Sequence, residues 1–156
     1  MKIKRSITLF FLMVFCAYAS AQLIIDDEGF YYDEDNELYT GVYIEFYPNG
    51  NKSIELSLKN GEIDGISTIY FEDGTMNEIR SYRNGKMDGT WITWNEKGVK
   101  IGEANYKDDQ KHGEWFIWDE NGTLRFEMHY RDGKKSGVWK MYGEDGELVS
   151  KDDNDK

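Results

Sequence analysis

The segment GTWITWNEKG, residues 89–98, is followed by GEWFIWDENG, residues 113–122. Both copies contain Gly-x-Trp-x-x-Trp, both end at a glycine after a turn-forming sequence, and they begin 24 residues apart. Glycines continue this step along the chain in three series: Gly41, Gly65, Gly89, Gly113 and Gly137; Gly50, Gly74, Gly98, Gly122 and Gly146; and Gly61, Gly85 and Gly133, with Asp109 in the vacant place. A fixed period over this length indicates a tandem-repeat protein, and these are its predicted turn glycines.

Each repeat contains two turn signals. Most glycines of the second and third series follow Asn or Asp, and such pairs favour the tight turns of β-hairpins. The intervening runs are rich in Tyr, Trp, Ile, Phe and Thr, which favour strands. A rung of a parallel β-helix also fits this period, but two tight turns per repeat favour antiparallel hairpins. We therefore predict an all-β fold, an antiparallel β-meander of about four and a half hairpin repeats in a single-sheet or solenoid-like arrangement.

The first residues indicate an export signal. Lys2, Lys4 and Arg5 precede an apolar run over residues 7–18, and Ala-Ser-Ala follows at 19–21. This is the pattern of a signal peptide, and the apolar run is too short to span a bilayer. We predict an exported protein of the periplasm, the cell surface or the medium. Lipid anchoring at Cys16 is disfavoured because a bulky phenylalanine precedes it.

The chain is accordingly divided into four parts. We predict a signal peptide at 1–21, an acidic N-terminal capping segment at 22–40, repeats at 41–149 and a disordered tail at 150–156. The repeats begin at residues 41, 65, 89, 113 and 137. Cleavage would remove the single cysteine and three positive charges, which moves the formal net charge from -11 to -14. Such a chain cannot form a disulfide and should be repelled by nucleic acid and anionic membranes.

Aromatic residues recur at fixed places in the repeat, and all five tryptophans lie two or five residues after a first-series glycine. The predicted repeat-core aromatics are Tyr43, Phe46, Tyr70, Tyr82, Trp91, Trp94, Tyr106, Trp115, Trp118, Tyr130, Trp139 and Tyr142. We expect an aromatic row packed between neighbouring repeats rather than a cage for a quaternary amine or a sugar. Because places two and five differ in parity, either a bulge separates them or both sheet faces carry aromatics.

Residues 113–148, GEWFIWDENGTLRFEMHYRDGKKSGVWKMYGEDGEL, resemble the bacterial variant of the MORN repeat, and the resemblance extends over residues 39–148. Ser67 in place of Trp and Asp109 in place of Gly depart from the pattern, so the second and third repeats are expected to be less regular. Proteins of this kind are grouped with YwqK-type antitoxins, which implies binding to another protein. MORN repeats in general are associated with protein contacts and, in eukaryotic proteins, with membrane lipids.

Catalytic and metal-binding patterns are lacking in the sequence. His112 and His129, the only histidines, occupy different places in the repeat and match no nucleophile or zinc spacing. Asp33, Asp35 and Glu37 resemble the start of a calcium loop, but Leu38 stands where such a loop needs glycine. We predict no enzyme activity, no cofactor and no metal.

Charge differs between the two sets of turns. Residues 71–75, 95–99, 119–123 and 143–147 together carry a net charge of -7, whereas residues 59–64, 83–88, 107–112 and 131–136 carry +2. In a meander these sets line opposite edges. We therefore predict a non-catalytic scaffold that binds another protein, a toxin or an envelope protein, through a sheet face or a charged edge. The alternative is a carbohydrate- or choline-binding surface module with aromatic grooves between hairpins.

Overall fold

The computed structural model describes residues 23–156, so the predicted signal peptide lies outside the described residues. In this part of the chain every regular element is a strand, and no helix is long and apolar enough to cross a membrane. The strands are β1 (Ile24–Ile25), β2 (Tyr31–Tyr32), β3 (Gly41–Phe46), β4 (Lys52–Lys59), β5 (Glu62–Tyr70), β6 (Met76–Arg83), β7 (Lys86–Met87), β8 (Gly89–Trp94), β9 (Lys100–Lys107), β10 (Gln110–Lys111), β11 (Gly113–Trp118), β12 (Leu124–Arg131), β13 (Lys134–Tyr142) and β14 (Leu148–Asp153).

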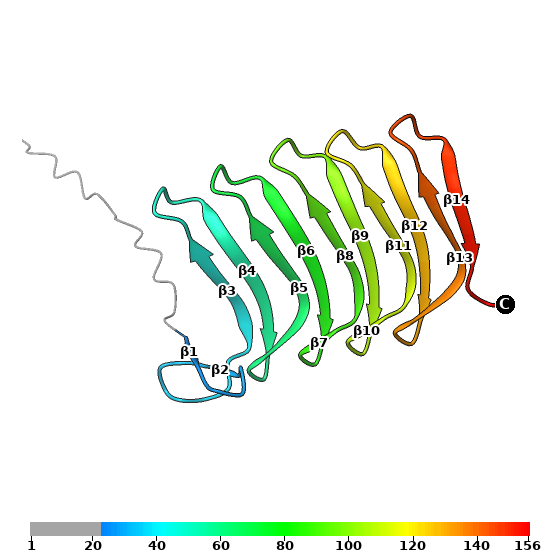
Figure 1. Cartoon of the computed structure of the whole chain (residues 1–156). Coiled ribbons are helices and arrows are strands. Elements are labelled where there is room, and N and C mark those ends of the chain that lie inside the picture. The colour runs from blue at the N-terminus through cyan, green and yellow to red at the C-terminus, as the bar shows by residue number, and fades with distance from the viewer. Residues whose placement is uncertain (1–22) are drawn as a thin grey trace, which may run out of the picture.

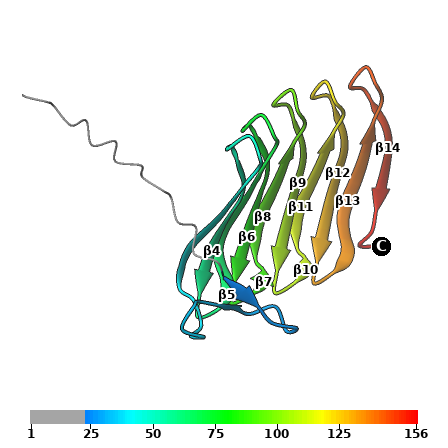
Figure 2. The ribbon, with the colours of Figure 1, turned by 90° about the vertical axis from the view of Figure 1, so that its left-hand side faces the viewer.

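The repeats form one antiparallel sheet of 12 strands. Its order is β14-β13-β12-β11-β9-β8-β6-β5-β4-β3, with the short strands β7 and β10 pairing with β6 and β9. The predicted meander is thus confirmed. The sheet is a single curved layer, and its turns alternate between two edges, the upper and lower edges of Figure 1 (Figures 1 and 2).

The lower-edge turns are two-residue turns in which both residues have positive φ. The values are 50° and 79° at Asn60-Gly61, and 47° and 65° at Asp108-Asp109. This geometry matches the right-handed twist of the flanking strands. Asp109 therefore adopts the same conformation as the glycines it replaces, which Asp tolerates better than most residues.

The upper-edge turns are longer than the tight turns that the sequence predicted. In the first of them Tyr47 N–H donates to the Asn51 carbonyl at 2.8 Å, and Gly50 N–H donates to the Tyr47 carbonyl at 2.9 Å. Only the glycine has positive φ, 88° at Gly50. After each of these turns the pairing skips one residue of the returning strand, so that a β-bulge occurs at Ser53, Asn77, Ile101, Arg125 and Val149.

The N-terminal segment contacts the first hairpin. Tyr31 N–H donates to the Gly61 carbonyl at 2.9 Å, and Gly61 N–H donates to the Tyr39 carbonyl at 2.8 Å. The Tyr31 ring lies 6.1 Å from the ring of Tyr43 on β3. Figure 1 shows β1 and β2 at the lower edge, beside β3 and β4.

The prediction of a disordered tail is wrong for most of residues 150–156. Residues up to Asp153 belong to β14, which pairs with β13 from Tyr142 to Val138. Beyond the strand, Asn154 N–H donates to the Gly137 carbonyl at 2.9 Å. The segment is highly charged, but β13 offers a free edge, and backbone pairing does not depend on apolar side chains.

A one-layer sheet has almost no interior. Among residues 23–156 the buried apolar side chains are Leu56, Leu58 and Met128, and none of the large side chains is fully buried. Stability must therefore come mainly from contacts between side chains of adjacent strands. Such contacts join each repeat to the next, as in other repeat proteins.

Candidate binding surface

Six aromatic rings form a continuous row across the last repeats. Successive centroid distances from Tyr82 through Trp91, Tyr106, Trp115, Tyr130 and Trp139 are 5.6, 4.9, 5.1, 5.3 and 5.2 Å. These tilted and edge-on contacts suit aromatic pairs. Burial raises the pKa of Tyr106 and Tyr130. We call the side of the sheet that carries this row the aromatic-row face.

Each tryptophan of the row also donates a hydrogen bond to the preceding repeat. Trp91 Nε1 donates to the Ser81 carbonyl at 3.1 Å, Trp115 Nε1 to the Asn105 carbonyl at 2.9 Å, and Trp139 Nε1 to the His129 carbonyl at 3.0 Å. At His129 the regular pairing of β12 with β13 is interrupted. The Ser81 and Asn105 carbonyls also accept backbone N–H groups, from Asp88 and His112, so at these two places the indole adds a second hydrogen bond to the carbonyl.

The row does not continue from Tyr82, on the returning strand of the second repeat, toward the first repeat. Ser67, which replaces tryptophan, is only 3% exposed, and Leu56 and Leu58 are buried beside β5. Tyr43 instead contacts Tyr31 of the N-terminal segment. The irregular second repeat expected from the sequence is therefore an interruption of the aromatic row and not a break in the sheet.

Cations lie over several of these rings. Lys111 Nζ is 4.3 Å from the centroid of Trp115, Lys135 Nζ is 3.9 Å from that of Trp139, and the Arg80 guanidinium carbon is 5.0 Å from that of Trp91. These groups occupy ring faces that a quaternary ammonium ligand would need. The arrangement favours a structural row over an aromatic cage.

The second aromatic column lies on the opposite side of the sheet. On β11, Phe116 and Trp118 lie on the side opposite to Trp115. The ring centroids of Phe116 and Trp118 are 5.6 Å apart. Tyr142 Oη on β13 donates to Glu127 Oε2 at 3.0 Å. Of the two alternatives for the parity of the motif, the second therefore holds: both faces carry aromatics, and the bulge lies in the returning strand rather than between places two and five. The remaining members of this column are Phe46, Tyr70 and Trp94.

Ion pairs lie on this side, which we call the ion-pair face; two of them join residues of one strand and the third joins β12 to β13. Lys52 Nζ lies 2.5 Å from Glu55 Oε2, Lys100 Nζ lies 2.8 Å from Glu103 Oε2, and Lys140 Nζ lies 2.7 Å from Glu127 Oε1. Lys100 Nζ is also 4.3 Å from the Trp118 centroid. The hydrogen bond from Lys140, and then that from Tyr142, lowers the pKa of Glu127.

We expect Glu127→Gln to lower the free energy of unfolding near neutral pH by about 1 kcal/mol, the upper range for partly exposed pairs. Because the folded-state pKa of Glu127 is lowered, its contribution is present above the usual carboxyl pKa of 4.5 and is lost as the pH falls through the folded value. Urea unfolding at about pH 7 and pH 2.5 measures this difference. Glu144→Gln, in an exposed turn, is the control, and an equal loss at both pH values would contradict the assignment.

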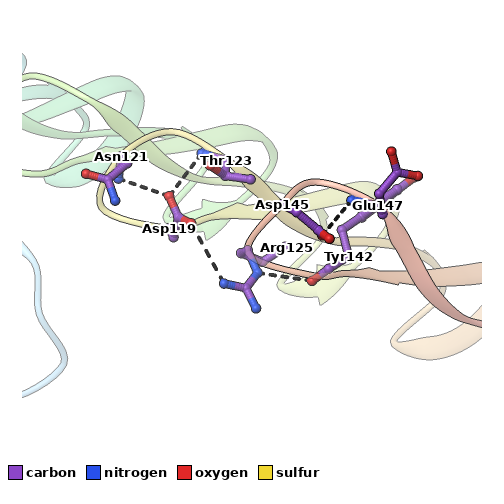
Figure 3. A network of polar contacts seen from close by, with 7 residues as sticks. All are labelled: Asp119, Asn121, Thr123, Arg125, Tyr142, Asp145 and Glu147. Atoms are coloured by element: carbon purple, nitrogen blue, oxygen red, sulfur yellow. Dashed lines mark hydrogen bonds and ion pairs between the residues drawn. The ribbon is translucent and has the colours of Figure 1, made fainter.

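Polar side chains join consecutive turns along the upper edge. Figure 3 shows that Asp119 accepts hydrogen bonds from the Asn121 and Thr123 amides, both at 3.0 Å, while the Arg125 side chain donates to the Tyr142 carbonyl at 3.1 Å. The Thr123 bond makes the largest contribution to a lowered pKa of Asp119. Arg125 is the bulge residue, so the bulge directs its side chain from one repeat to the next.

Two of the hollows on the described part of the sheet have mainly apolar linings. One, of about 400 Å³, is lined by Gly74, Thr75, Met76, Trp94 and Gly98. In the described part of the chain, Trp94 is the only indole with neither an aromatic ring nor a cation packed against it. The other, which we call the C-terminal groove, has about 340 Å³ and is lined mainly by Ile117, Phe126, Met128, Trp139 and Met141.

The two histidines contact different partners. His129 Nδ1 is 2.8 Å from Ser136 Oγ, and His112 Nδ1 is 3.3 Å from Asp132 Oδ1 at a lower-edge turn. Ser136 is 7% exposed, which leaves it poorly accessible to a substrate. Within residues 23–156 no group of three or more His, Cys, Asp or Glu side chains is placed to hold a metal ion. Asp33 and Asp35, which resembled the start of a calcium loop, lie in an exposed turn. There the Asp33 carboxylate accepts hydrogen bonds from the Asp35 and Glu37 amides.

Sequence comparison agrees with the structural period. The family model described as MORN repeat variant matches residues 39–60, 63–84, 87–108 and 111–132. No curated protein matches the chain. The fifth hairpin, β13–β14, lies beyond the matched residues but continues the same sheet.

Proposed function

Because the chain belongs to the MORN repeat variant family, whose repeats act as binding modules, we propose that it is a non-catalytic scaffold that binds another protein. The binding would use the exposed side chains of the sheet faces. Such a protein needs no catalytic activity, because its function is to present a binding surface of fixed shape.

The observation that supports this proposal is the amount of apolar surface on an uncovered sheet. Contiguous apolar patches on a soluble protein mark interaction sites more often than isolated residues do. Ile117, Phe126 and Met141 are exposed and directly paired across three strands, so they form one such patch. The other exposed large apolar side chains are Ile24, Ile25, Leu38, Val42, Phe46, Ile66, Met76, Leu148 and Val149.

The proposal includes export and a partner at the cell envelope. The charged, apolar and Ala-Ser-Ala segments of residues 1–21 support export. A toxin or an envelope protein would then be the partner, in line with the resemblance to YwqK-type antitoxins, and the acidic upper edge would favour a basic partner surface. Fractionation of producing cells, with the mass of the mature chain, tests the export.

Co-purification tests the binding itself. The tagged mature protein is recovered from envelope extracts, its companions are identified by mass spectrometry, and each is purified and titrated against the wild-type chain. We expect one companion to bind saturably and to lose at least tenfold in affinity when an exposed apolar residue of one face becomes serine. If purified companions do not bind in titrations, the scaffold proposal fails.

The hollow at Trp94 favours one second candidate, a carbohydrate site. The indole lies between two hairpins and is not covered by a ring or a cation, so a sugar ring could stack on it. If this function is correct, Trp94→Ala will abolish binding of cell-wall oligosaccharides, whereas Trp118→Ala, on the same column, will retain it. Calorimetric titration of the two variants distinguishes them, and absence of saturable binding to the wild-type protein excludes the candidate.

A further inference from the structure

The two ends of the sheet differ in how their edges are covered. At β3, Tyr39 Oη is 3.4 Å from the Val42 carbonyl oxygen, and the Tyr39 ring lies so close to Gly41 that a Cβ there would be 2.7 Å from its hydroxyl. At the other end β14 pairs only with β13 among the described residues. Figures 1 and 2 show β14 as the uncovered last strand. An open edge of this kind can pair with another strand.

The C-terminal groove ends at this open edge. Ile117, Phe126 and Met141 are directly paired across β11, β12 and β13, and they are 42%, 38% and 36% exposed. The next member of the same cross-strand row is Ser150 on β14. An apolar side chain on an added strand, placed opposite Ser150, would reach over this serine toward Met141 and extend the apolar row.

On the ion-pair face, a positive charge at the same edge lacks an acidic partner among the described residues. Lys140 and Lys151 lie directly opposite each other on β13 and β14. Lys140 is neutralised by Glu127 on its other side, but among the described residues Lys151 forms no ion pair. Like charges in opposed positions are unfavourable, so an acidic side chain beside Lys151 would stabilise this row.

The β3 edge of a second copy of the chain fits this edge poorly. In the sheet Glu55 and Ile54 of a returning strand pair with Thr68 and Ile69 of the next repeat. The same register would put Ile44 of a second copy opposite Lys151, and Glu45 opposite Ser150 and close to Asp152. On the ion-pair face Lys151 would then have no acidic partner. On the aromatic-row face the carboxylates of Glu45 and Asp152 would repel each other.

We propose that β14 and the C-terminal groove bind an extended strand of a partner protein, with an acidic residue opposite Lys151 and apolar residues opposite Ser150 and Asp152. This inference rests on the proposed protein-binding function and names its partner class. The added strand continues the sheet by backbone hydrogen bonds, and the apolar–acidic–apolar order sets its register.

The probe is a capped peptide with Thr-Val-Glu-Val-Thr at its centre, titrated into the ¹⁵N-labelled protein. We expect saturable amide shifts confined to β13 and β14. Lys151→Glu should weaken binding at least tenfold, and a peptide with Lys in place of Glu should restore binding to that variant. Because the introduced carboxylate would face Lys140, this variant stays folded, and Lys97→Glu in an upper-edge turn is the control of equal charge change.

Three outcomes would overturn the inference: equal binding of a scrambled peptide, shifts elsewhere on the sheet, or concentration-dependent dimers that Lys151→Glu abolishes. The last outcome would identify a second copy as the occupant. If a native partner binds the wild-type protein and Lys151→Glu equally well, the strand inference fails while the scaffold function stands. If no native partner exists, the peptide titration still decides whether the edge accepts a strand.

Discussion

Replacing Trp115 by alanine is expected to lower the free energy of unfolding by about 3 kcal/mol, within the range for large aromatic truncations. The indole packs against Tyr106 at 5.1 Å and Tyr130 at 5.3 Å, and its Nε1 donates to the Asn105 carbonyl. The substitution removes both contacts and leaves that carbonyl without the indole donor. Urea unfolding followed by far-ultraviolet circular dichroism measures the loss.

The matched control is Trp94→Ala, which removes the same side chain from an open hollow without an aromatic neighbour. Its expected cost is about 1 kcal/mol, because less area returns to water. Equal losses from the two variants would show that the aromatic row contributes no stability beyond that of an isolated ring. Because Trp115 joins repeats 3 and 4, its loss should also reduce the cooperativity of unfolding.

Replacing Gly89 by alanine should cost about 3 kcal/mol, from a strained backbone and a close contact together. Gly89 has a φ of 107°, a conformation that L residues rarely adopt, and an added Cβ would lie 3.0 Å from Ser81 Cβ. Gly89 is paired with Tyr106 of the aromatic row, so relaxing the strain would shift the row as well. Urea midpoints of the two proteins measure the effect.

Gly102→Ala is the control for this substitution. Gly102 lies in β9 without a positive φ, and an added Cβ would meet Thr93 at an ordinary distance of 3.6 Å. We expect this variant to be as stable as the wild-type protein or more stable by about 0.5 kcal/mol, since alanine restricts the unfolded chain. A similar loss of stability at both glycines would show that a positive φ is not the reason why glycine recurs every 24 residues within this chain.

Much of the fold follows from the sequence because its determinants are local. Asn-Gly and Asp-Gly pairs specify the lower-edge turns directly, and the 24-residue period requires every hairpin to repeat the same geometry. The alternation of Tyr82, Trp91 and Tyr106 between adjacent strands also follows from the spacing. These features need no knowledge of distant contacts.

The features that could not be predicted depend on neighbouring strands. Arg125 is a bulge residue only because Trp118 pairs with Leu124, and parity along one strand does not reveal which strand carries the extra residue. Likewise, β14 is a strand because β13 lies beside it, although its own sequence suggests a charged tail. The C-terminal groove arises from apolar residues on three different strands, which no single stretch of sequence displays.

Because the glycines are regularly spaced, such a protein can gain or lose whole repeats. Excising 24 residues between Gly65 and Gly137 would rejoin equivalent places, so every bulge and every strand pairing would find a matching neighbour. Each unit contributes two strands, or roughly 10 Å of width. Duplication and deletion of whole units could therefore adjust the reach of the molecule in fixed steps while leaving both of its ends, and whatever they contact, unaltered.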